Sequence, residues 1–244
     1  MGSPDTMSSA IDDLTAHELQ VRGLYTHDVD GRIRLVNEPG GGIAPRFYFA
    51  RTSSGNLWRV RHDLPDAMVR ALERLAGQER VSDDLDAPPD NMAAFIAVLQ
   101  DGEFAPLVKR GPAYRFPATL PRHDEPIRIT RSNSDLLREM PAYRRDIDEA
   151  FEEREPRFAI VEDGIAVSIC NTVRLTDRSA EAGVDTLEGY RGRGYAPQVV
   201  AAWAHAVRAA GRIPFYSTSR DNFASQSVAR KLGLIHYASY VSIV

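Results

Sequence analysis

The sequence predicts a mixed α/β protein in two parts, with a small α+β lobe followed by a more regular C-terminal half. Three observations predict this. The first half contains short hairpins and helices, a proline-rich stretch at 117–126 disfavours regular structure, and the second half has the predicted order β-α-β-β-β-α-β-α-β. At 244 residues, with 43% apolar and 26% charged residues, the chain is long enough for one large domain or two small ones.

Two hairpins and two helices are expected in the N-terminal lobe, placed at residues 8–120. Asp30-Gly31 between two short strands is a strong hairpin signal, and Pro65 and Gly77 are typical of the two ends of a helix. The expected elements are strands at 25–28, 33–36, 46–51 and 57–61, and helices at 65–77 and 91–99. No motif in this lobe indicates a reaction.

The C-terminal half, residues 127–244, is expected to alternate strands with helices. Ser134 is expected to cap a helix that Pro141 interrupts and that resumes towards Phe151. Pro197 begins a later helix whose apolar residues form one stripe and which Gly211 ends. The remaining expectations are strands at 127–130, 157–161, 165–173, 181–187 and 213–217, a helix at 222–232 and a final extended tail.

Composition excludes several classes of function. No stretch has the roughly 18–20 apolar residues that a membrane span needs, and a net charge of −4 with a pI of 5.9 argues against nucleic acid as a partner. Cys170 is the single cysteine, so no internal disulfide and no cysteine metal cage is expected, and a buried apolar role is predicted for it. His17-Glu18 begins like a zinc motif, but its fifth position is Val21. Residues 1–7 are polar and resemble a tag, and a cytoplasmic location is expected.

The informative segment is the predicted strand-to-helix junction at 191–196. Gly192 and Gly194 allow the backbone to curl tightly and leave the inner surface of the loop without side chains. The loop leads into a helix N-terminus, where unpaired N–H groups attract an anion. Arg191 and Arg193 add positive charge. The pattern indicates a phosphate or diphosphate site, while a tight turn with no ligand stays an alternative.

Two common phosphate-binding motifs do not fit this loop. The dinucleotide fingerprint G-x-G-x-x-G would begin at Gly192, but its third glycine falls on Pro197. A P-loop requires G-x-x-x-x-G-K-[ST], and neither Lys109 nor Lys231 follows such a loop. The ligand is therefore expected to be another phosphate compound.

The segment Arg191-Gly192-Arg193-Gly194-Tyr195-Ala196 matches R/Q-x-x-G-x-G/A, and it resembles the acetyl-CoA loop of the GCN5-related N-acetyltransferase (GNAT) family. Residues 180–186 resemble the family's fourth strand, and residues 222–234 resemble its closing asparagine and helix. The resemblance covers roughly 127–244 and implies the GNAT acyl-CoA N-acyltransferase fold for the C-terminal half. The first half resembles only the lead-in lobe of some bacterial members.

The resemblance assigns residues to the cofactor, acetyl-CoA. It implies that the backbone of Val184, Asp185 and Thr186 holds the pantetheine arm, where a splay between the fourth and fifth strands admits it. The diphosphate lies on the amides of 191–196, that is, Arg191, Gly192, Arg193, Gly194, Tyr195 and Ala196. Asn222 contacts the cofactor, although a plain helix cap is an equal alternative. No metal is implied.

The resemblance also suggests how an amine attacks the thioester. The amide of Val184 would stabilise the oxyanion, and Glu181, at the start of the fourth strand, would act as general base through a water. Asp185 and Glu188 are further candidates for the base, and Glu181 as a solvated or arginine-paired carboxylate is an equal alternative. Many members carry a tyrosine seven residues beyond the asparagine as general acid, and Ala229 occupies that position here. Ser225 is the preferred substitute, and it is also expected to contact the cofactor; Tyr216, Tyr237 or water are alternatives.

The sequence therefore predicts a cytoplasmic N-acetyltransferase that transfers an acetyl group from acetyl-CoA to an amine of a small molecule or peptide in a ternary complex. A non-catalytic acyl-CoA-binding or sensing module is the alternative, because Ala229 replaces the usual acid. An interaction protein that keeps the fold without the ligand is a third reading. The partners expected are acetyl-CoA and the amine, without nucleic acid or membrane. The sequence indicates neither which amine is the acceptor nor an oligomeric state.

Overall fold

The computed structural model describes residues 11–100, 106–140 and 151–244, and these residues form two compact units. Unit 1 contains residues 115–216 and 223–235, and unit 2 contains residues 11–114, 217–222 and 236–244. The proline-rich stretch 117–126 contains no helix or strand and begins close to where the chain passes from unit 2 into unit 1. The last strand of the chain, however, lies in the same unit as the N-terminal half.

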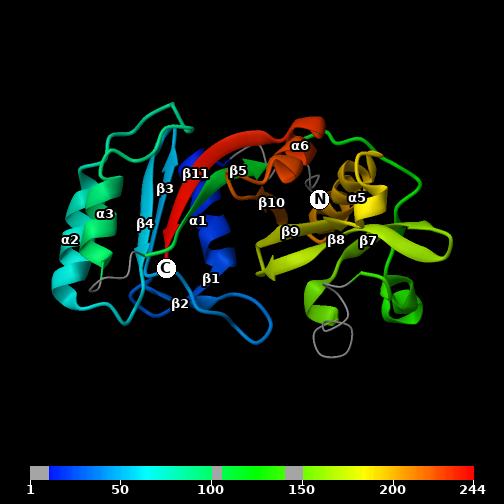
Figure 1. The fold of residues 1–244 in the computed structure, drawn as a ribbon, viewed down its shortest axis with the longest axis horizontal. Coiled ribbons are helices and arrows are strands. Elements are labelled where there is room, and N and C mark those ends of the chain that lie inside the picture. The colour runs from blue at the N-terminus through cyan, green and yellow to red at the C-terminus, as the bar shows by residue number, and fades with distance from the viewer. Residues whose placement is uncertain (1–10, 101–105, 141–150) are drawn as a thin grey trace. The chain divides into compact units, whose positions relative to one another are not determined.

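Unit 2 is built on an antiparallel sheet with helices (Figure 1). Its elements are α1 (Asp13–Leu24), β1 (Tyr25–His27), β2 (Ile33–Val36), β3 (Phe47–Thr52), β4 (Gly55–Val60), α2 (Asp66–Gly77), α3 (Met92–Leu99), β5 (Val108–Arg115) and β11 (Ile235–Ile243). The strands of the main sheet lie in the order β4-β3-β11-β5, and β1 and β2 form a separate hairpin. Both predicted hairpins and both predicted helices are confirmed, whereas α1 and β5 were not predicted.

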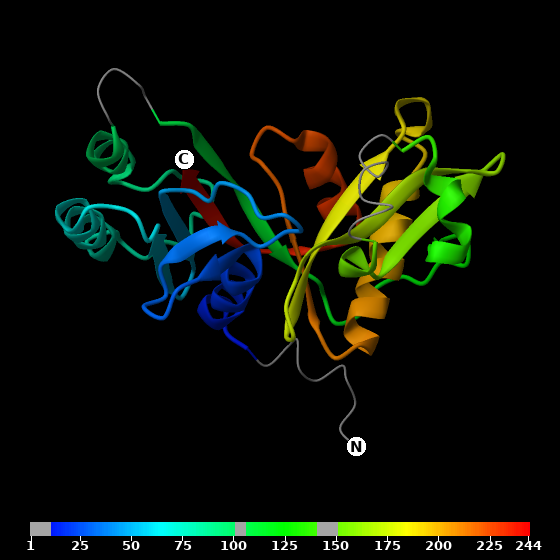
Figure 2. The same ribbon diagram turned by 90° about the horizontal axis from the view of Figure 1, so that it is seen from below.

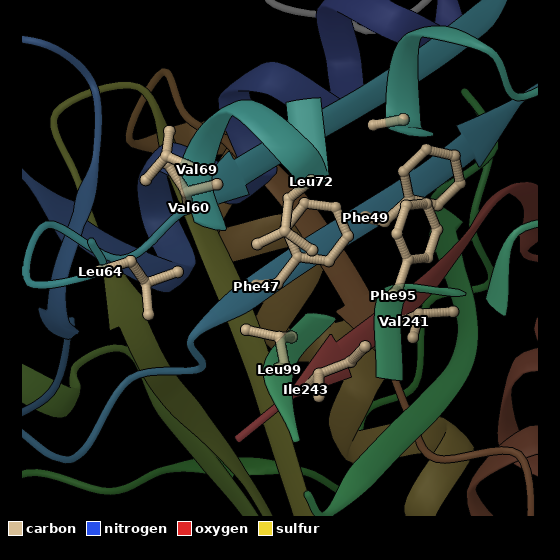
Figure 3. Packing of buried hydrophobic residues seen from close by; sticks show 11 residues of the cluster. Phe47, Phe49, Val60, Leu64, Val69, Leu72, Phe95, Leu99, Val241 and Ile243 are labelled. Atoms are coloured by element: carbon tan, nitrogen blue, oxygen red, sulfur yellow. The ribbon is translucent and has the colours of Figure 1, made fainter. Parts of the chain in front are cut away.

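The core of unit 2 lies between this sheet and the helices α2 and α3 (Figure 3). Phe47 and Phe49 project from β3 towards Phe95 of α3, and the ring centroids of Phe47 and Phe95 are 4.9 Å apart. Val241 and Ile243 of β11 are buried in the same cluster. Because each such side chain contributes roughly 1.5–3 kcal/mol when fully buried, the C-terminal strand is an integral part of this core.

Unit 1 contains a mixed sheet in the order β10-β9-β8-β7-β6. Its elements are β6 (Ile127–Arg128), the 3-10 helices η2 (Arg131–Leu137), η4 (Glu152–Arg154) and η5 (Glu188–Tyr190), strands β7 (Arg157–Glu162), β8 (Ile165–Leu175), β9 (Ser179–Thr186) and β10 (Ile213–Ser217), and helices α5 (Tyr195–Ala209) and α6 (Phe223–Lys231). Strands β6 to β9 are antiparallel, and β10 is parallel to β9. The predicted strands and helices from 157 onwards are confirmed.

The two faces of this sheet are covered by different elements (Figure 2). Helix α5 covers one face, where buried Trp203 donates a hydrogen bond from its indole Nε1 to Thr172 Oγ1 at 3.0 Å. On the opposite face Ile169 packs with Leu137 and Phe151, which come from η2 and the residue before η4. Alternation along β8 and β9 therefore assigns each strand residue to one of these faces.

The segment after β6 differs from the prediction. The helix begins at Arg131 with a capping box, in which Asn133 Oδ1 accepts the Thr130 N–H at 2.7 Å. Ser134 does not cap a helix, because its hydroxyl donates to the Arg131 carbonyl at 3.0 Å inside the turn that is already formed. The predicted continuation through 141–150 and the tag-like residues 1–7 lie outside the described residues.

Candidate functional site

The predicted anion-binding loop joins β9 to α5 through the short helix η5. Gly192 has φ +79° and Gly194, the N-cap of α5, has φ +86° and ψ 11°. These left-handed conformations are the ones that glycine adopts at little cost. A Cβ added to either glycine would meet no atom within 4 Å. The surface of the loop is therefore open, and the glycines are required by backbone conformation and not by packing.

Several amides at this junction have no acceptor in the part of the chain that the structure describes, although the Arg191 N–H donates to the Glu188 carbonyl at 3.2 Å. Gly194 provides no side-chain cap for α5, and no backbone carbonyl accepts from the N–H groups of Gly192, Gly194 or Ala196 among the described residues. A helix N-terminus with unpaired N–H groups is an anion-binding site by geometry and by dipole. The loop therefore presents donors that a diphosphate would satisfy.

The arginine side chains of the loop make contacts within unit 1. Arg191 Nε donates to the Thr186 carbonyl at 3.2 Å. Arg193 donates to the Gly189 carbonyl at 3.1 Å, lies over the Tyr190 ring at 4.7 Å from its centroid, and forms an ion pair with Glu162 at 3.4 Å. Arg191 and Arg193 flank Gly192 in the chain, so their charges keep the local potential positive.

Strand β9 is paired on both sides only over its first half. Its parallel pairing with β10 ends at Glu181 opposite Phe215, whereas its pairing with β8 continues to Thr186 opposite Ser168. The second half of β9 therefore has an edge that β10 no longer covers. This divergence is the splay between the fourth and fifth strands that the sequence analysis expected.

The backbone of Val184 points to this open edge. The Leu187 N–H donates to the Val167 carbonyl of β8 at 2.9 Å. Because alternate residues of a strand point their backbone groups to opposite sides, those of Val184 and Thr186 point away from β8. Thr186 has partners for both of its groups: its N–H donates to Asp185 Oδ1 at 2.8 Å, and its carbonyl accepts from Arg191. Of Val184 and Thr186, Val184 is therefore the residue for which the described part of the chain supplies no partner to either backbone group.

Glu181 lies where β9 is still paired on both sides, opposite Arg174 of β8 and Phe215 of β10, and its side chain is 6% exposed. Ala182 opposes Thr172, the residue that Trp203 of α5 contacts, so Glu181 belongs to the face opposite α5. The next residue on that face is Gly183, where a Cβ would lie 2.2 Å from Val173 Cγ1. The role of Glu181 as a base stays a prediction.

Ser225 lies in the first turn of α6, and its hydroxyl is 2.6 Å from the hydroxyl of buried Tyr216. Tyr216 follows Phe215, the last residue of β10 that pairs with β9, so the two hydroxyls lie near the point where the strands diverge. Ala229 is completely buried. Tyr237, an alternative acid, is in unit 2, where its hydroxyl donates to Gln20 and is 3.2 Å from His17.

Asn222 belongs to unit 2, where it ends a short turn and its N–H donates to the Ser219 carbonyl at 3.1 Å. The remaining predicted site residues all lie in unit 1. Glu162, at the end of β7, was missed: its carboxylate accepts hydrogen bonds from Arg193 and from the hydroxyl of Tyr195, the first residue of α5. That hydrogen bond raises the pKa of Tyr195. Separations of 31 and 33 residues give such contacts no local signal in the sequence.

The other motifs that the sequence drew attention to have structural roles. His17 is completely buried between the hydroxyls of Tyr48 and Tyr237, and burial lowers its pKa to about 3. Burial also raises the pKa of Cys170, whose predicted apolar burial is confirmed. Among the described residues, no group of three or more His, Cys, Asp or Glu side chains is arranged to hold a metal ion. Within the same ranges no helix is both long and apolar enough to span a bilayer.

The sequence matches a known family over the half that carries the loop. Residues 129–243 match the profile of the family described as GNAT acetyltransferase. The matched residues belong to the GNAT acetyltransferase family. The matched range ends in β11, so the final strand of the GNAT sequence pairs with β3 of unit 2. No curated protein matches the chain.

Solved structures similar to the chain include several acetyltransferases. A putative GNAT acetyltransferase from Novosphingobium aromaticivorans is 15% identical, with 56% of this chain and 64% of that chain covered and a TM-score of 0.47. A GCN5-related N-acetyltransferase-like protein from Streptococcus suis is 17% identical, with 82% and 85% covered and a TM-score of 0.47. An aminoglycoside N-acetyltransferase in complex with CoA is 23% identical, with 44% and 89% covered and a TM-score of 0.37. The chain thus spans less than two thirds of the Novosphingobium protein.

Proposed function

We propose that this protein is an N-acetyltransferase that transfers an acetyl group from acetyl-CoA to an amine of a small molecule or peptide, by direct attack in a ternary complex. The observation that carries the proposal is the junction of two open backbone surfaces. The uncovered edge of β9 at Val184 leads into the loop in which the N–H groups of Gly192, Gly194 and Ala196 have no acceptor among the described residues. A thioester on a long arm attached to a diphosphate fits this arrangement.

The proposed cofactor site follows the chain from Val184 to Ala196. The diphosphate accepts from the amides of 191–196, above all those of Gly192, Gly194 and Ala196, because the Arg191 N–H already donates to the Glu188 carbonyl. The arm runs along Val184, Asp185 and Thr186. Of these three, Val184 supports the proposal best, because the N–H and carbonyl of Thr186 already have partners in the protein. Asn222 is proposed as a further contact to the cofactor.

The proposed chemistry begins with a neutral amine. An alkylamine with a pKa near ~10 is mostly protonated at pH 7, and deprotonating it costs roughly 4 kcal/mol. Glu181 would remove that proton through a water, and the Val184 N–H would stabilise the oxyanion that forms when the amine attacks the carbonyl carbon.

The leaving thiolate needs a proton after the carbon–sulfur bond breaks. Ser225 is the proposed donor, and its hydroxyl contact with Tyr216 offers a route by which a proton is resupplied. A thiolate with a pKa near ~8.5 is a fair leaving group, so this step needs modest assistance. The cytoplasmic location expected from the sequence and the amine acceptor are parts of the same proposal.

Calorimetric titration with acetyl-CoA tests the binding half of the proposal. The wild-type protein is expected to bind, and Gly194→Glu is expected to abolish binding, because it places a carboxylate against the diphosphate. Gly77→Glu at the end of α2, where a Cβ also meets no atom within 4 Å, is the matched control and should bind normally. Equal binding by Gly194→Glu and wild type would refute the loop as the diphosphate site.

Release of free thiol with a panel of amines tests the chemical half. The expected result is that turnover falls in Glu181→Gln with acetyl-CoA binding retained, and that turnover falls in Ser225→Ala by more than acetyl-CoA binding does. Binding of acetyl-CoA without turnover for any amine in the panel would overturn the assignment as an enzyme and favour an acyl-CoA-binding module.

A further inference from the structure

The outer side of the candidate loop is held by one carboxylate. Glu162 is the last residue of β7 and pairs with Ile165 across a tight hairpin. One of its oxygens accepts a hydrogen bond from the Tyr195 hydroxyl, and the other pairs with the Arg193 guanidinium at 3.4 Å. Arg193 and Tyr195 are the two neighbours of Gly194 in the chain. A single side chain on the neighbouring hairpin thus holds the loop on both sides of its left-handed glycine.

These contacts restrict the part of the loop that is otherwise the most flexible. Glycine has the largest conformational freedom of all residues, and among the described residues the N–H groups of Gly192, Gly194 and Ala196 have no acceptor that would fix them. The Arg193 side chain is also fixed by the Gly189 carbonyl and the Tyr190 ring. Because ordering a binding loop before the ligand arrives lowers the cost of binding, these contacts favour tight binding of an anion at the amides.

The charge of Glu162 argues against a direct contact with an anion. A carboxylate beside a diphosphate would repel it unless a cation neutralises the carboxylate. Arg193 provides that neutralisation, with 49% of its side chain exposed against 30% for Glu162. The contribution of Glu162 to binding is therefore made through Arg193 and Tyr195 and not through the ligand.

We propose that Glu162 is a positioning residue that presets the loop 191–196 for the diphosphate of the cofactor. The inference rests on the proposed function, in which this loop binds acetyl-CoA. Two roles of the Glu162 side chain have opposite effects on the affinity for the diphosphate. A positioning carboxylate strengthens binding of the diphosphate, whereas a carboxylate that only adds negative charge weakens it.

Two substitutions at this position distinguish the roles. Glu162→Gln keeps an oxygen that accepts from Tyr195 or Arg193 but removes the charge, and Glu162→Ala removes both contacts. If Glu162 positions the loop, Kd for acetyl-CoA should rise about tenfold in Glu162→Ala, equivalent to ~1.4 kcal/mol, and at most about threefold in Glu162→Gln. Tighter binding by both variants would overturn the proposal, because it would mean that the carboxylate only repels the ligand.

The matched control is Asp163→Asn in the same hairpin. Asp163 makes no hydrogen bond or ion pair within the ranges that the structure describes, and its φ of +49° is one that asparagine adopts readily. Asp163 directly follows Glu162 in the chain. The variant therefore removes one negative charge close to the loop and leaves the contacts of Glu162 with Arg193 and Tyr195 intact. Its Kd should equal that of wild type, and a tenfold change in it would show that charge alone sets the affinity.

A thioester without a diphosphate separates positioning of the loop from general damage. S-acetylpantetheine lacks the phosphates, so KM for S-acetylpantetheine should be the same in Glu162→Ala and wild type while KM for acetyl-CoA rises. A matching rise for both thioesters would overturn the proposal. If Glu162→Ala does not fold, Tyr195→Phe removes one contact only, and KM should then rise about threefold for acetyl-CoA alone.

The failure of this inference is distinguishable from a failure of the proposed function. If wild-type protein binds no acetyl-CoA, the proposed function is wrong and with it the ligand assumed for Glu162. If wild type binds acetyl-CoA and Glu162→Ala binds it equally well, only the positioning role of Glu162 is refuted.

Discussion

Gly194→Ala isolates the energetic cost of the loop conformation, because the added methyl group meets no atom within 4 Å and therefore adds no steric clash. At φ +86° and ψ 11° an L-residue is strained by roughly 1–2 kcal/mol relative to glycine. Alanine also reduces the freedom of the unfolded chain, which offsets about 0.4–1 kcal/mol of that cost. The net expectation is a free energy of unfolding lowered by about 1 kcal/mol.

The strain at residue 194 can lower the affinity for acetyl-CoA instead of the free energy of unfolding. If the loop of Gly194→Ala relaxes in the free protein, the free energy of unfolding hardly changes, and the strain returns when the diphosphate reorders the loop. In that case Kd for acetyl-CoA rises about fivefold, which corresponds to ~1 kcal/mol. The two losses should therefore add up to about 1 kcal/mol, however the loop divides them.

Urea unfolding and calorimetric titration of the same preparations measure both losses. Gly189→Ala is the control, since Gly189 has no positive φ and a Cβ there also meets no atom within 4 Å. It should keep the stability and the affinity of wild type or gain slightly in stability. If Gly194→Ala matches Gly189→Ala in both measurements, the left-handed glycine is not a requirement of this site and the reasoning fails.

Three further predictions concern burial. Burial lowers the folded-state pKa of His17 to about 3, below the 6.5 of the unfolded chain, so His17 contributes stability above pH 6.5 that is lost as the pH falls towards 3. The free energy of unfolding of His17→Gln, measured with urea, should therefore fall less over that pH range than the free energy of unfolding of wild type. An equal dependence on pH in both proteins would contradict this. Cys170, completely buried with a raised pKa, should react with a thiol reagent only at the rate of unfolding, and fast labelling of the native protein would contradict the burial. The fragment 127–244 should lack a cooperative unfolding transition by circular dichroism, because Val241 and Ile243 of β11 are buried against the N-terminal half.

The loop was predictable because its determinants are local. Gly192, Gly194 and the start of α5 are consecutive in the chain, so the sequence already specifies a turn that opens onto a helix N-terminus. The hairpins of unit 2 were predictable for the same reason. Helix α1 was missed because its buried face contains polar His17 and Gln20, which conceals the apolar spacing that normally indicates a helix.

The features that were not predicted depend on contacts between distant residues. The tail at 235–243 reads as extended chain, but its alternation does not specify that it pairs with β3 rather than with a strand of the C-terminal half. Serine is a residue type that often caps a helix, but here the N-cap is Thr130, four residues before Ser134, and the side chain of Asn133 completes the capping box. Which strand the tail pairs with, and which residue caps the turn, depend on competition between several possible partners. A single segment of the sequence does not contain that information.

In this loop the glycines indicate the groups available to bind a phosphate better than the arginines do. Arg191 and Arg193 suggested that charge holds the ligand, yet the Nε of Arg191 is bonded to Thr186 and the guanidinium of Arg193 to Glu162 and Gly189. The groups without an acceptor among the described residues are the neutral amides of Gly192, Gly194 and Ala196. Recognition by such amides depends on their direction, and their direction depends on the left-handed glycines. Gly194 and the carboxylate of Glu162 therefore act on one property, the orientation of the N–H groups at the start of α5, and substitutions at the two positions should weaken the binding of the same phosphate groups.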